Sequence, residues 1–502
     1  MLSEKEILRL QNGSDVRGVA VAGVADEPVT LFPEAVNRIA AGFVDFLSNK
    51  TGKAARELII TVGHDSRVSA KELKKHILGA IIAKGAKAVD CGLASTPAMF
   101  MSTVFEETKA TGAIMITASH LPYNRNGMKF FTRDGGLEHE DIEEVLTLAS
   151  KNHEQSADTS AAAAYDLIDL YAGHLVRKIE EGLGAAAGSK PLAGMHIVVD
   201  AGNGGGGFFA GKVLDVLGAD TSGSQFLEPD GMFPNHIPNP ENKEAMQAIR
   251  KAVLDHKADL GLIFDTDVDR MSAVLPDGEE ISRNALIAMM AAILAPDYPG
   301  GAIVTDSVTS DELEKFLTEE LHLVHHRYMR GYKNVINECM RLNAAGTVSP
   351  LAIETSGHGA LSENYYLDDG AYLAVKLLIA AAKAHREGRS LSTLIEKLGH
   401  PAEAKEYRLK IVGREDFRAY GNGVLKDFEA KAKAKGYDVK TPSFEGVRLV
   451  FPEGWALLRL SLHDPNMPLN IESREAGGAA KIAAQVKELL TDADGLDRSA
   501  LA

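Results

Sequence analysis

The residues best suited to chemistry lie in short loops that follow apolar runs. The first loop, residues 117–122, contains Ser119 between apolar runs at 113–116 and 128–131. Such runs are typical of buried strands, so we expect Ser119 where the first strand ends. Three nitrogen-bearing side chains follow it closely: His120, Arg125 and Lys129. Positive charge suits a hydroxyl that carries or receives a phosphoryl group, although a polar turn capped by Ser119 has the same pattern.

A second loop carries three carboxylates in alternate positions after the predicted strand 260–264: Asp265, Asp267 and Asp269. Extended backbone would point them to one side. Carboxylates roughly 4 Å apart repel by on the order of 4 kcal/mol per pair at an effective dielectric of about 20, and a divalent cation removes that penalty. A calcium helix-loop-helix site would need Gly at Arg270 and an acidic residue at Pro276. Oxygen ligands therefore favour magnesium or manganese, with a solvated acidic turn as the alternative.

Two further loops carry weaker signals. Glu354 and Ser356 follow the apolar run 351–353 and can grip vicinal sugar hydroxyls, but a capping turn fits equally well. Arg459 and Ser461 can hold a phosphate, with the arginine binding in forked geometry, or can simply end a strand.

The glycine run at 202–207 satisfies a dinucleotide-binding pattern and follows a predicted strand, and Glu228 lies somewhat late for the acidic ribose ligand. The run also nearly forms a nucleotide phosphate loop, but Val213 stands where a magnesium-binding Ser or Thr is needed. We interpret the run as a turn with close backbone approach rather than as a dinucleotide site.

The elements that position these loops repeat an order of strand and helix three times. Short β-branched runs alternate with amphipathic segments, which predicts α/β domains with mainly parallel sheets. The clearest predicted strands are 58–62, 196–200, 260–264, 302–305 and 321–325, and the clearest helices are 70–83, 97–108 and 243–256. After about residue 400 we expect a smaller α+β domain with an antiparallel sheet. Its predicted strands are 405–412, 448–451 and 457–462, and its helices are near 415–435 and 477–491.

Composition narrows the class of protein. A chain of 502 residues predicts roughly three or four domains. The net charge of −16, from 54 basic and 70 acidic residues, argues against nucleic acid or an anionic membrane as partner. Only Cys91 and Cys339 are present, so a reducing compartment is expected. Without a signal-peptide pattern or a spanning apolar run, we expect a cytoplasmic protein.

Taken in order, the motifs resemble the α-D-phosphohexomutase family, which includes phosphoglucomutase and phosphomannomutase. The matching segments are 13–18, 63–69, the Ser119 loop, 265–270, 331–333, 354–358 and the Arg459 loop. They are similar to the family's start, its Gly-x-Asp-x-Arg-x-Ser segment, its phosphoserine and metal loops, two sugar-contact loops and a phosphate-binding loop. Leu121 stands where the family usually has Asn, and residues 462–464 replace most of the usual phosphate loop.

The resemblance implies four domains around a central cleft: 1–160 with the phosphoserine loop, 161–280 with the metal loop, 281–400 with the sugar contacts, and 401–502 with the phosphate-binding loop. It implies an isomerase of carbohydrate metabolism that interconverts hexose 1-phosphate and hexose 6-phosphate, with glucose or mannose as the sugar. The phosphoryl group would pass through Ser119 and a bisphosphorylated sugar. Mg²⁺ is the implied cofactor, and hexose 1,6-bisphosphate the implied activator and intermediate.

The resemblance also implies residue roles. The catalytic set is Ser119, Lys129, Arg17 and His120. The Mg²⁺ ligands are Ser119, Asp265, Asp267 and Asp269. The substrate contacts are Arg270, Arg330, Lys333, Glu354, Ser356, His358, Arg459, Ser461 and His463. Lys129 is the candidate general acid and base, since a lysine among cations can have its pKa lowered.

Two functions of other classes stay open. A dinucleotide-dependent oxidoreductase would use the 202–207 glycine run, and titration with NADH would detect it. A non-catalytic sugar-phosphate sensor would keep the binding loops without turnover, and a mutase assay would distinguish it.

Overall fold

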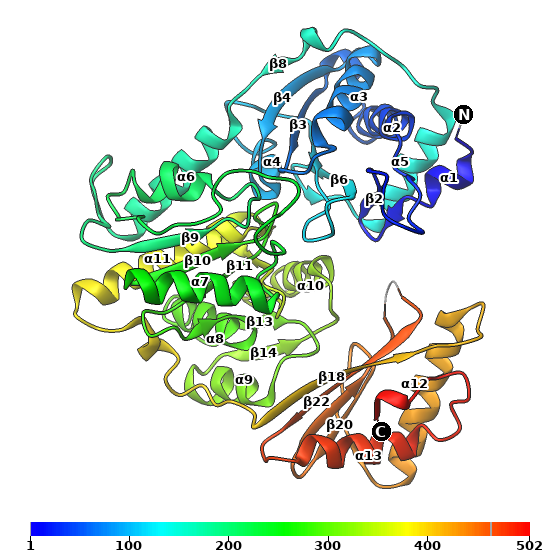
Figure 1. The fold of residues 1–502 in the computed structure, drawn as a ribbon, viewed down its shortest axis with the longest axis vertical. Coiled ribbons are helices and arrows are strands. Elements are labelled where there is room, and N and C mark those ends of the chain that lie inside the picture. The colour runs from blue at the N-terminus through cyan, green and yellow to red at the C-terminus, as the bar shows by residue number, and fades with distance from the viewer. Residues whose placement is uncertain (1, 462–463, 502) are drawn as a thin grey trace. The chain divides into compact units, whose positions relative to one another are not determined.

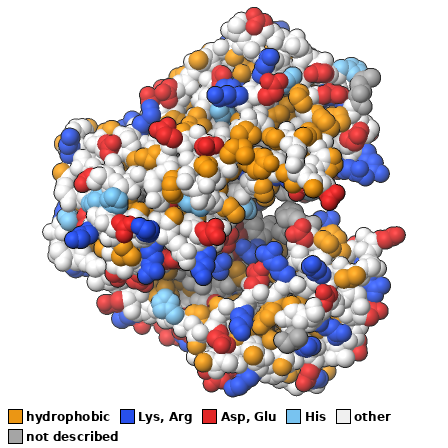
Figure 2. Space-filling view, viewed as in Figure 1, with side chains coloured by type: hydrophobic (Ala, Val, Ile, Leu, Met, Phe, Trp, Pro, Cys, Tyr) orange, Lys and Arg blue, Asp and Glu red, His pale blue; other side chains and the backbone are white. Residues whose placement is uncertain are grey.

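The computed structural model describes residues 2–461 and 464–501. It divides into two compact units, one of residues 1–293 and 356–394 and the other of residues 294–355 and 395–502. Figure 1 shows the ribbon and its element labels. Among the described residues, no helix has the length and apolar character needed to cross a bilayer. Figure 2 shows acidic and basic side chains interspersed on the visible face.

The first sheet of unit 1 has the strand order β1-β2-β6-β5-β3-β4-β8, with β7 beside β6. Its strands are β1 (Gln11–Asn12), β2 (Asp15–Val19), β3 (Ile59–His64), β4 (Lys87–Leu93), β5 (Gly112–Ile116), β6 (Arg125–Thr132), β7 (Gly135–Gly136) and β8 (Ala163–Ala164). Strand β3 runs parallel to β4 and β5, whereas β6 runs antiparallel to β5 and β2. The end of β5 therefore lies beside the start of β6.

Helices cover this sheet and complete its core. They are α1 (Glu4–Leu8), α2 (Pro33–Thr51), α3 (Ala70–Ala83), α4 (Thr96–Met101), α5 (His139–Lys151) and α6 (Leu167–Gly182). One hydrophobic cluster joins α2, α3 and α5 to the sheet, with Phe43 and Phe130 at ring-centre distance 4.9 Å. The apolar stripe of α3, at Leu73, Ile77 and Ile81, is buried as its period predicts.

The second sheet of unit 1 has the order β12-β11-β10-β9. Its strands are β9 (Ile197–Asp200), β10 (Leu260–Phe264), β11 (Met271–Val274) and β12 (Glu280–Ile281). Strands β9 and β10 are parallel, and α7 (Lys243–His256) packs on them through Met246, Ile249 and Val253. Unit 1 also contains the short π-helical segment η3 (Phe209–Leu214), the antiparallel pair β16 (Gly359–Leu361) and β17 (Leu367–Asp368), and α11 (Gly370–Arg386). Helix α8 (Arg283–Leu294) ends this part of the chain.

Unit 2 begins with three parallel strands and ends with an antiparallel sheet. Strand β13 (Ala302–Thr305) pairs with β14 (Val324–Arg327) and β15 (Leu351–Ile353), and α9 (Asp311–Lys315), η4 (Phe316–Glu320) and α10 (Tyr332–Ala344) connect them. The C-terminal sheet has the order β18-β22-β21-β20-β19. Its elements are β18 (Glu403–Lys410), α12 (Phe417–Ala434), β19 (Asp438–Val439), β20 (Val447–Phe451), β21 (Gly454–Leu458), β22 (Asn466–Ser473) and α13 (Gly478–Leu489). Both helices share its hydrophobic core.

The predicted fold class is confirmed: α/β sheets precede an antiparallel C-terminal sheet. Several element boundaries differ from expectation, three of them by more than two residues. The helix expected at 97–108 is only α4, because Thr103 and Thr108 hydroxyls bond to nearby carbonyls and end the regular ladder. The strand expected at 321–325 starts at Val324, since Leu323 N donates to Leu317 O. The strand expected at 457–462 ends at Leu458, and Leu462 lies outside the described residues.

A buried carboxyl group anchors the only tryptophan of the chain. Trp455 Nε1 donates to Glu472 Oε2 at 3.0 Å, and the Arg448 guanidinium lies 3.6 Å from the indole centre. Arg448 Nη2 also donates to Asp311 Oδ1 at 2.7 Å, which links the C-terminal sheet to the start of α9. Burial raises the pKa of Glu472 to about 7.

We predict that Glu472→Gln gains stability over the unchanged protein as pH rises. Folding raises the pKa of this carboxyl from 4.5 to about 7, so the folded state resists an ionisation that the unfolded state undergoes. The unchanged protein therefore loses up to about 3 kcal/mol between these two pH values, and the Gln variant avoids that loss. Urea unfolding near pH 5 and near pH 8, followed by Trp455 fluorescence, measures the difference.

Glu475→Gln is the matched control, because that side chain is 56% exposed. A stability difference between Glu472→Gln and the unchanged protein that is constant across pH would contradict the assignment.

Candidate active site

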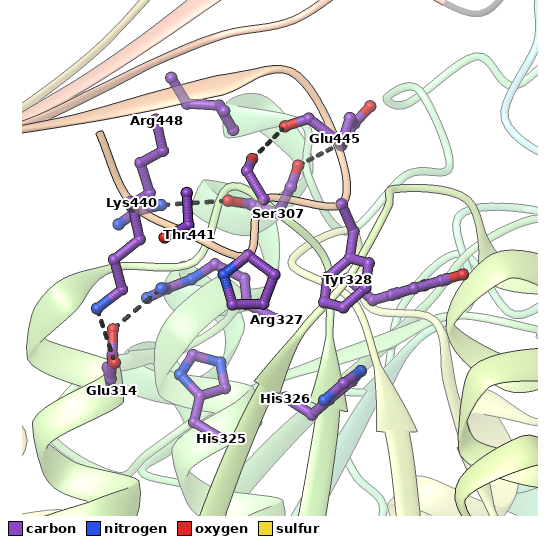
Figure 3. Close-up of a pocket in the computed structure, with 14 residues that line it drawn as sticks. Ser307, Glu314, His325, His326, Arg327, Tyr328, Lys440, Thr441, Glu445 and Arg448 are labelled. Carbon is purple, nitrogen blue, oxygen red and sulfur yellow. Dashed lines mark hydrogen bonds and ion pairs between the residues drawn. The ribbon is translucent and has the colours of Figure 1, made fainter. Parts of the chain in front are cut away.

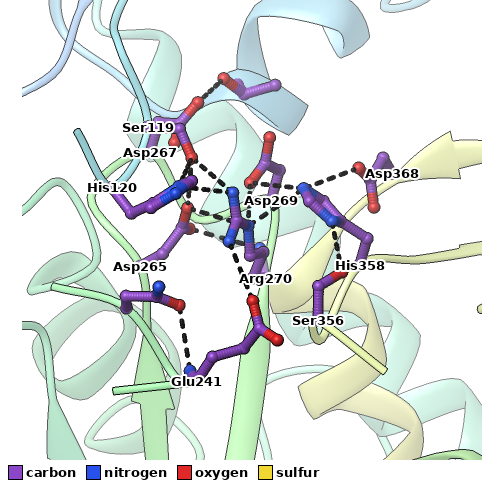
Figure 4. A network of polar contacts seen from close by, with 12 residues as sticks. Ser119, His120, Glu241, Asp265, Asp267, Asp269, Arg270, Ser356, His358 and Asp368 are labelled. Carbon is purple, nitrogen blue, oxygen red and sulfur yellow. Dashed lines mark hydrogen bonds and ion pairs between the residues drawn. The ribbon is translucent and has the colours of Figure 1, made fainter. Parts of the chain in front are cut away.

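Ser119 follows β5 in a conformation that is unusual for serine. It is 1% exposed and has a φ of 51°, in the left-handed region that costs a non-glycine residue roughly 1–2 kcal/mol. Its hydroxyl donates to Asp265 Oδ2 at 3.1 Å and accepts from Arg270 Nη2 at 3.0 Å (Figure 4). The serine oxygen is thus held between a carboxylate and a guanidinium from the second sheet.

The acidic loop, residues 265–269, is a tight turn at the end of β10. Val268 has a φ of 67°, and Asp265 N donates to Arg270 O at 3.4 Å. The expected extended backbone is therefore wrong, because the turn, and not strand alternation, brings the carboxylates together. One oxygen of each lies within 4.8 Å of the others, and all three residues are buried: Asp265, Asp267 and Asp269.

The 202–207 glycine run supports this loop by close packing. A Cβ at Gly204 would lie 2.7 Å from Thr266 O, and one at Gly207 would lie 2.2 Å from Leu227 O. The predicted turn with close backbone approach is confirmed. Because these glycines lack side chains, the 202–207 run can pack directly against the acidic loop. This packing explains the glycines without a bound dinucleotide.

Lys129 reaches the acidic loop from β6. Its ammonium group donates to Asp267 Oδ2 at 3.1 Å and also bonds to Asp269. The sequence suggested cations around Lys129, but these two neighbours are carboxylates. Thr96 Oγ1 donates to the same Asp267 oxygen at 2.5 Å. Asp267 and Asp269 therefore have donors from the first sheet and its helix α4, and Asp265 has one from Ser119 in the loop after β5.

The cationic side chain that contacts the Ser119 hydroxyl is Arg270. Arg125, expected near Ser119 from its place in the sequence, instead forms an ion pair with Glu27 at 2.9 Å. Arg125 begins β6, and its side chain turns to that carboxylate. The prediction that Arg125 lies near the hydroxyl, made from its closeness in sequence, was therefore wrong.

His120 is a neutral neighbour of Ser119. Its Nδ1 accepts from Arg270 Nη2 at 2.7 Å and lies 3.3 Å from Ser119 Oγ. Burial, with the charges of Arg270 and Arg17, lowers the pKa of His120 to about 3. Arg17 lies on β2 and pairs with Asp15 at 2.9 Å. At neutral pH the imidazole accepts through Nδ1 and carries its proton on Nε2.

His358 binds the other side of Arg270. Arg270 Nε donates to His358 Nε2 at 3.0 Å, so His358 Nδ1 carries the proton and donates to Ser356 Oγ at 2.8 Å. Burial and the Arg270 charge lower the pKa of His358 well below its usual value. Its Nε2 lies 3.7 Å from both Asp269 Oδ1 and Asp368 Oδ2.

The acidic loop fits a magnesium ion. Asp267 Oδ1 and Asp269 Oδ1 are buried without a hydrogen-bond partner in the described part of the chain. Burial, with the charges of Asp269 and Asp267, raises the pKa of Asp265 well above its usual value. Compact oxygen donors that repel one another in a buried loop suit a small divalent cation.

Other predicted residues belong to unit 2. Glu354 is buried and accepts from Gly331 N at 2.7 Å. Arg330 N donates to Glu445 Oε2 at 3.2 Å, and Arg459 Nη1 lies 3.7 Å from Glu445 Oε1. Glu445 therefore holds the Arg330 backbone and the Arg459 guanidinium, whereas the Arg330 Nε lies 3.9 Å from Asp306 Oδ2.

Two further predicted contacts lie at the ends of elements in unit 2. Lys333 lies on the first turn of α10. Ser461 N donates to Asn466 O at 3.0 Å, in the connection between β21 and β22. His463 lies outside the described residues.

The sequence interpretation missed several residues of these clusters. Asp306 follows β13 as Asp265 follows β10, and it accepts from Thr355, so the same strand-end rule was available. Thr96 and Glu445 gave no signal, because a hydroxyl in a short helix and a carboxylate in an irregular loop are common.

A separate cavity of about 190 Å³ lies within unit 2 (Figure 3). Its basic side chains are paired with nearby carboxylates. Arg327 Nη1 donates to Glu314 at 3.0 Å, Lys440 lies 3.6 Å from the same carboxylate, and Arg448 binds Asp311 at 2.7 Å. Of the predicted catalytic and binding residues that the structure describes, none lines it.

Comparison with known proteins shows similarity over most of the chain. Models of Phosphoglucomutase/phosphomannomutase alpha/beta/alpha domains I, II and III match residues 9–156, 173–278 and 282–401. A phosphoglucomutase of Neisseria gonorrhoeae is 28% identical over 480 residues, 95% of each chain. A phosphomannomutase/phosphoglucomutase of Pseudomonas syringae pv. tomato is 28% identical over 446 residues, 88% of this chain and 90% of that one.

A solved structure extends the similarity to the fold. The crystal structure of a phosphoglucomutase/phosphomannomutase family protein from Burkholderia thailandensis aligns with a TM-score of 0.77. It is 25% identical to this chain, and the alignment covers 98% of both chains.

We predict that Mg²⁺ raises the melting temperature and that Asp267→Asn reduces this rise. A ligand that binds only the folded state stabilises it by about 2.7 kcal/mol at a hundred times its Kd, and the Asn variant loses one anionic donor. Thermal unfolding with MgCl₂ or with a chelator measures the effect. Asp297→Asn, at an exposed position, is the control. An equal Mg²⁺-dependent rise in both variants would exclude Asp267 as a ligand.

Proposed function

Because this chain belongs to the α-D-phosphohexomutase family and is a phosphoglucomutase/phosphomannomutase-type enzyme, we propose that it moves a phosphoryl group between the 1- and 6-positions of a hexose through Ser119. One observation carries this proposal. The buried Ser119 hydroxyl accepts from Arg270 and lies 3.1 Å from an acidic loop that fits a divalent cation.

In the proposed reaction, the phosphorylated Ser119 gives its phosphoryl group to the free hydroxyl of a hexose monophosphate. The bond between phosphorus and Ser119 Oγ breaks, and a bond from phosphorus to the sugar oxygen forms. The sugar becomes a 1,6-bisphosphate, and transfer of its other phosphoryl group returns Ser119 to the phosphorylated form. Arg270 supports this cycle, because its Nη2 donor is aimed at the oxygen on which negative charge develops.

In the first transfer the attacking sugar hydroxyl loses a proton and Ser119 Oγ gains one; in the second the Ser119 hydroxyl loses its proton and the released sugar oxygen gains one. Lys129 is the proposed base and acid for these proton transfers. It is buried on β6 and contacts the acidic loop, which supports a place beside the transferring group. His120 is proposed to orient Arg270, because its neutral Nδ1 accepts from Nη2. Arg17 is proposed to bind the phosphoryl oxygens.

Mg²⁺ would be held by Asp265, Asp267, Asp269 and the phosphorylated Ser119. When bound, it neutralises negative charge on phosphoryl oxygens. The oxygen donors and the two unbonded carboxylate oxygens support this choice of cation.

The remaining roles are proposed residue by residue. Glu354 and Ser356 would hold the 3- and 4-hydroxyls, with His358 and Arg270 near them and Lys333 as a further contact. A second proposed group binds the non-reacting phosphate: Arg330, Arg459, Ser461 and His463. The four-domain division at residues 160, 280 and 400 is part of the same proposal.

We predict that Ser119→Ala abolishes turnover, because the Ser119 hydroxyl bonds to both Arg270 and Asp265 of the acidic loop. Incubation with a hexose 1,6-bisphosphate, then peptide mapping by mass spectrometry, should place one phosphate on Ser119. Ser102→Ala is a matched control, since Ser102 is fully buried in the same domain. Label on another residue, or full turnover by Ser119→Ala, would refute the role of Ser119.

We predict activity on both glucose and mannose phosphates. In the proposed cycle the sugar binds in two orientations, held by contacts to its 3- and 4-hydroxyls. None of these contacts involves the 2-hydroxyl, which is where glucose and mannose differ. Arg459→Ala should lower kcat/KM for both sugars by a similar factor of roughly 10 to 100, the value of a charge-assisted hydrogen bond. Arg474→Ala, at an exposed arginine directly after β22, is the control. A sugar preference above about a hundredfold would reveal a residue that reads the 2-position.

A further inference from the structure

The Ser119 loop is held by one buried arginine that the proposed mechanism does not use. Arg67 lies between β3 and α3 and is 2% exposed. Its two terminal nitrogens donate to four backbone carbonyls of the loop, those of Ser119, Leu121, Pro122 and Arg125. The distances are 2.6 Å to Leu121 O, 2.7 Å to Pro122 O and 3.0 Å to Arg125 O, and the contact with Ser119 O is shorter.

These bonds explain how serine keeps a left-handed conformation. The φ of 51° at Ser119 turns its carbonyl toward Arg67. Within the loop, Ser119 N bonds to Thr117 Oγ1 at 2.9 Å and Leu121 N bonds to Ala118 O at 3.1 Å. Arg67 satisfies the carbonyls that this turn leaves inside the protein, so the loop geometry depends on it.

Arg67 is itself fixed from two sides. Its Nε lies 3.3 Å from Asp65 Oδ2, and its guanidinium lies 5.3 Å from the Phe233 ring centre. Phe233 comes from the loop between η3 and α7. That loop contacts the Arg67 segment directly, because a Cβ at Gly231 would lie 2.4 Å from Val68 N.

The same contacts account for Leu121, where the family usually has Asn. Arg67 binds the carbonyl of residue 121 and not its side chain, so this replacement leaves the contact intact.

We propose that Arg67 is a positioning residue that holds the Ser119 hydroxyl in line with Arg270 and Asp265. The inference rests on the proposed function in one respect, since it takes Ser119 as the phosphoryl carrier. A planar guanidinium presents its donors in two fixed forks, whereas a lysine ammonium has three donors on one nitrogen and cannot reach four carbonyls. Arg67→Lys therefore keeps the charge and loses the geometry.

The test compares Arg67→Lys with Arg38→Lys. Arg38 is a matched control, because it is 4% exposed in the same domain and donates to the carbonyls of Leu2, Ala149 and Ser150. We expect Arg67→Lys to lower kcat at least tenfold while KM changes less than about threefold. Hydrogen–deuterium exchange of residues 117–126 should become faster. Arg38→Lys should keep its kcat and the exchange of that loop.

Phe233→Ala keeps the proposal testable if Arg67→Lys does not fold. It leaves every Arg67 hydrogen bond possible and removes only the ring, so we expect the same two changes at smaller size. Unchanged loop exchange together with unchanged kcat in both variants would overturn the proposal, as would an equal loss of kcat in Arg38→Lys.

The outcome separates this inference from the proposed function. Full turnover by Ser119→Ala would remove the role of Ser119, and the exchange measurement on residues 117–126 would still decide whether Arg67 holds the loop.

Discussion

Three carboxylates buried in one turn are the constraint on which unit 1 depends. Water is excluded from Asp265, Asp267 and Asp269, so their repulsion must be offset by groups from elsewhere in the fold. Lys129 is brought by β6, and Thr96 contributes both its hydroxyl and a backbone N–H that donates to Asp267 O at 2.8 Å. The two sheets of unit 1 are therefore joined by charge neutralisation as well as by apolar packing.

The same constraint explains why loops that are far apart in sequence are so closely packed. Strand β6 must run antiparallel to β5 for Lys129 to lie beside the end of β5. Glycine at 204 must lack a side chain for its backbone to reach Thr266 in the acidic loop. A search for glycine patterns would interpret this run as a nucleotide site, although the steric need for it arises from the neighbouring loop.

Much of this arrangement could be predicted from the sequence, because periodicity and strand-end loops are local signals. Helices 70–83 and 243–256 were predicted to the residue, and the loops after β5, β10 and β15 were identified by their polar residues. What failed required tertiary information. The acidic loop is a turn because Val268 has a positive φ, Arg125 pairs with Glu27, and the serine's cation is Arg270, 151 residues away in the chain. Arg67 belongs to the 63–69 motif, but its contacts with four backbone carbonyls form only when the chain folds.

Arg270 couples two loops through a single rigid plane. Its Nε donates to His358 and its Nη2 donates to Ser119 and His120, while its backbone pairs with that of His358 in a short bridge. Delocalisation keeps the guanidinium atoms coplanar, so these bonds cannot be adjusted one at a time. A rotation of the His358 imidazole would tilt the whole plane and move the Nη2 donor away from the serine oxygen. The Arg270 donor on the Ser119 oxygen is thus tied to the orientation of the His358 imidazole, which bonds to the same guanidinium.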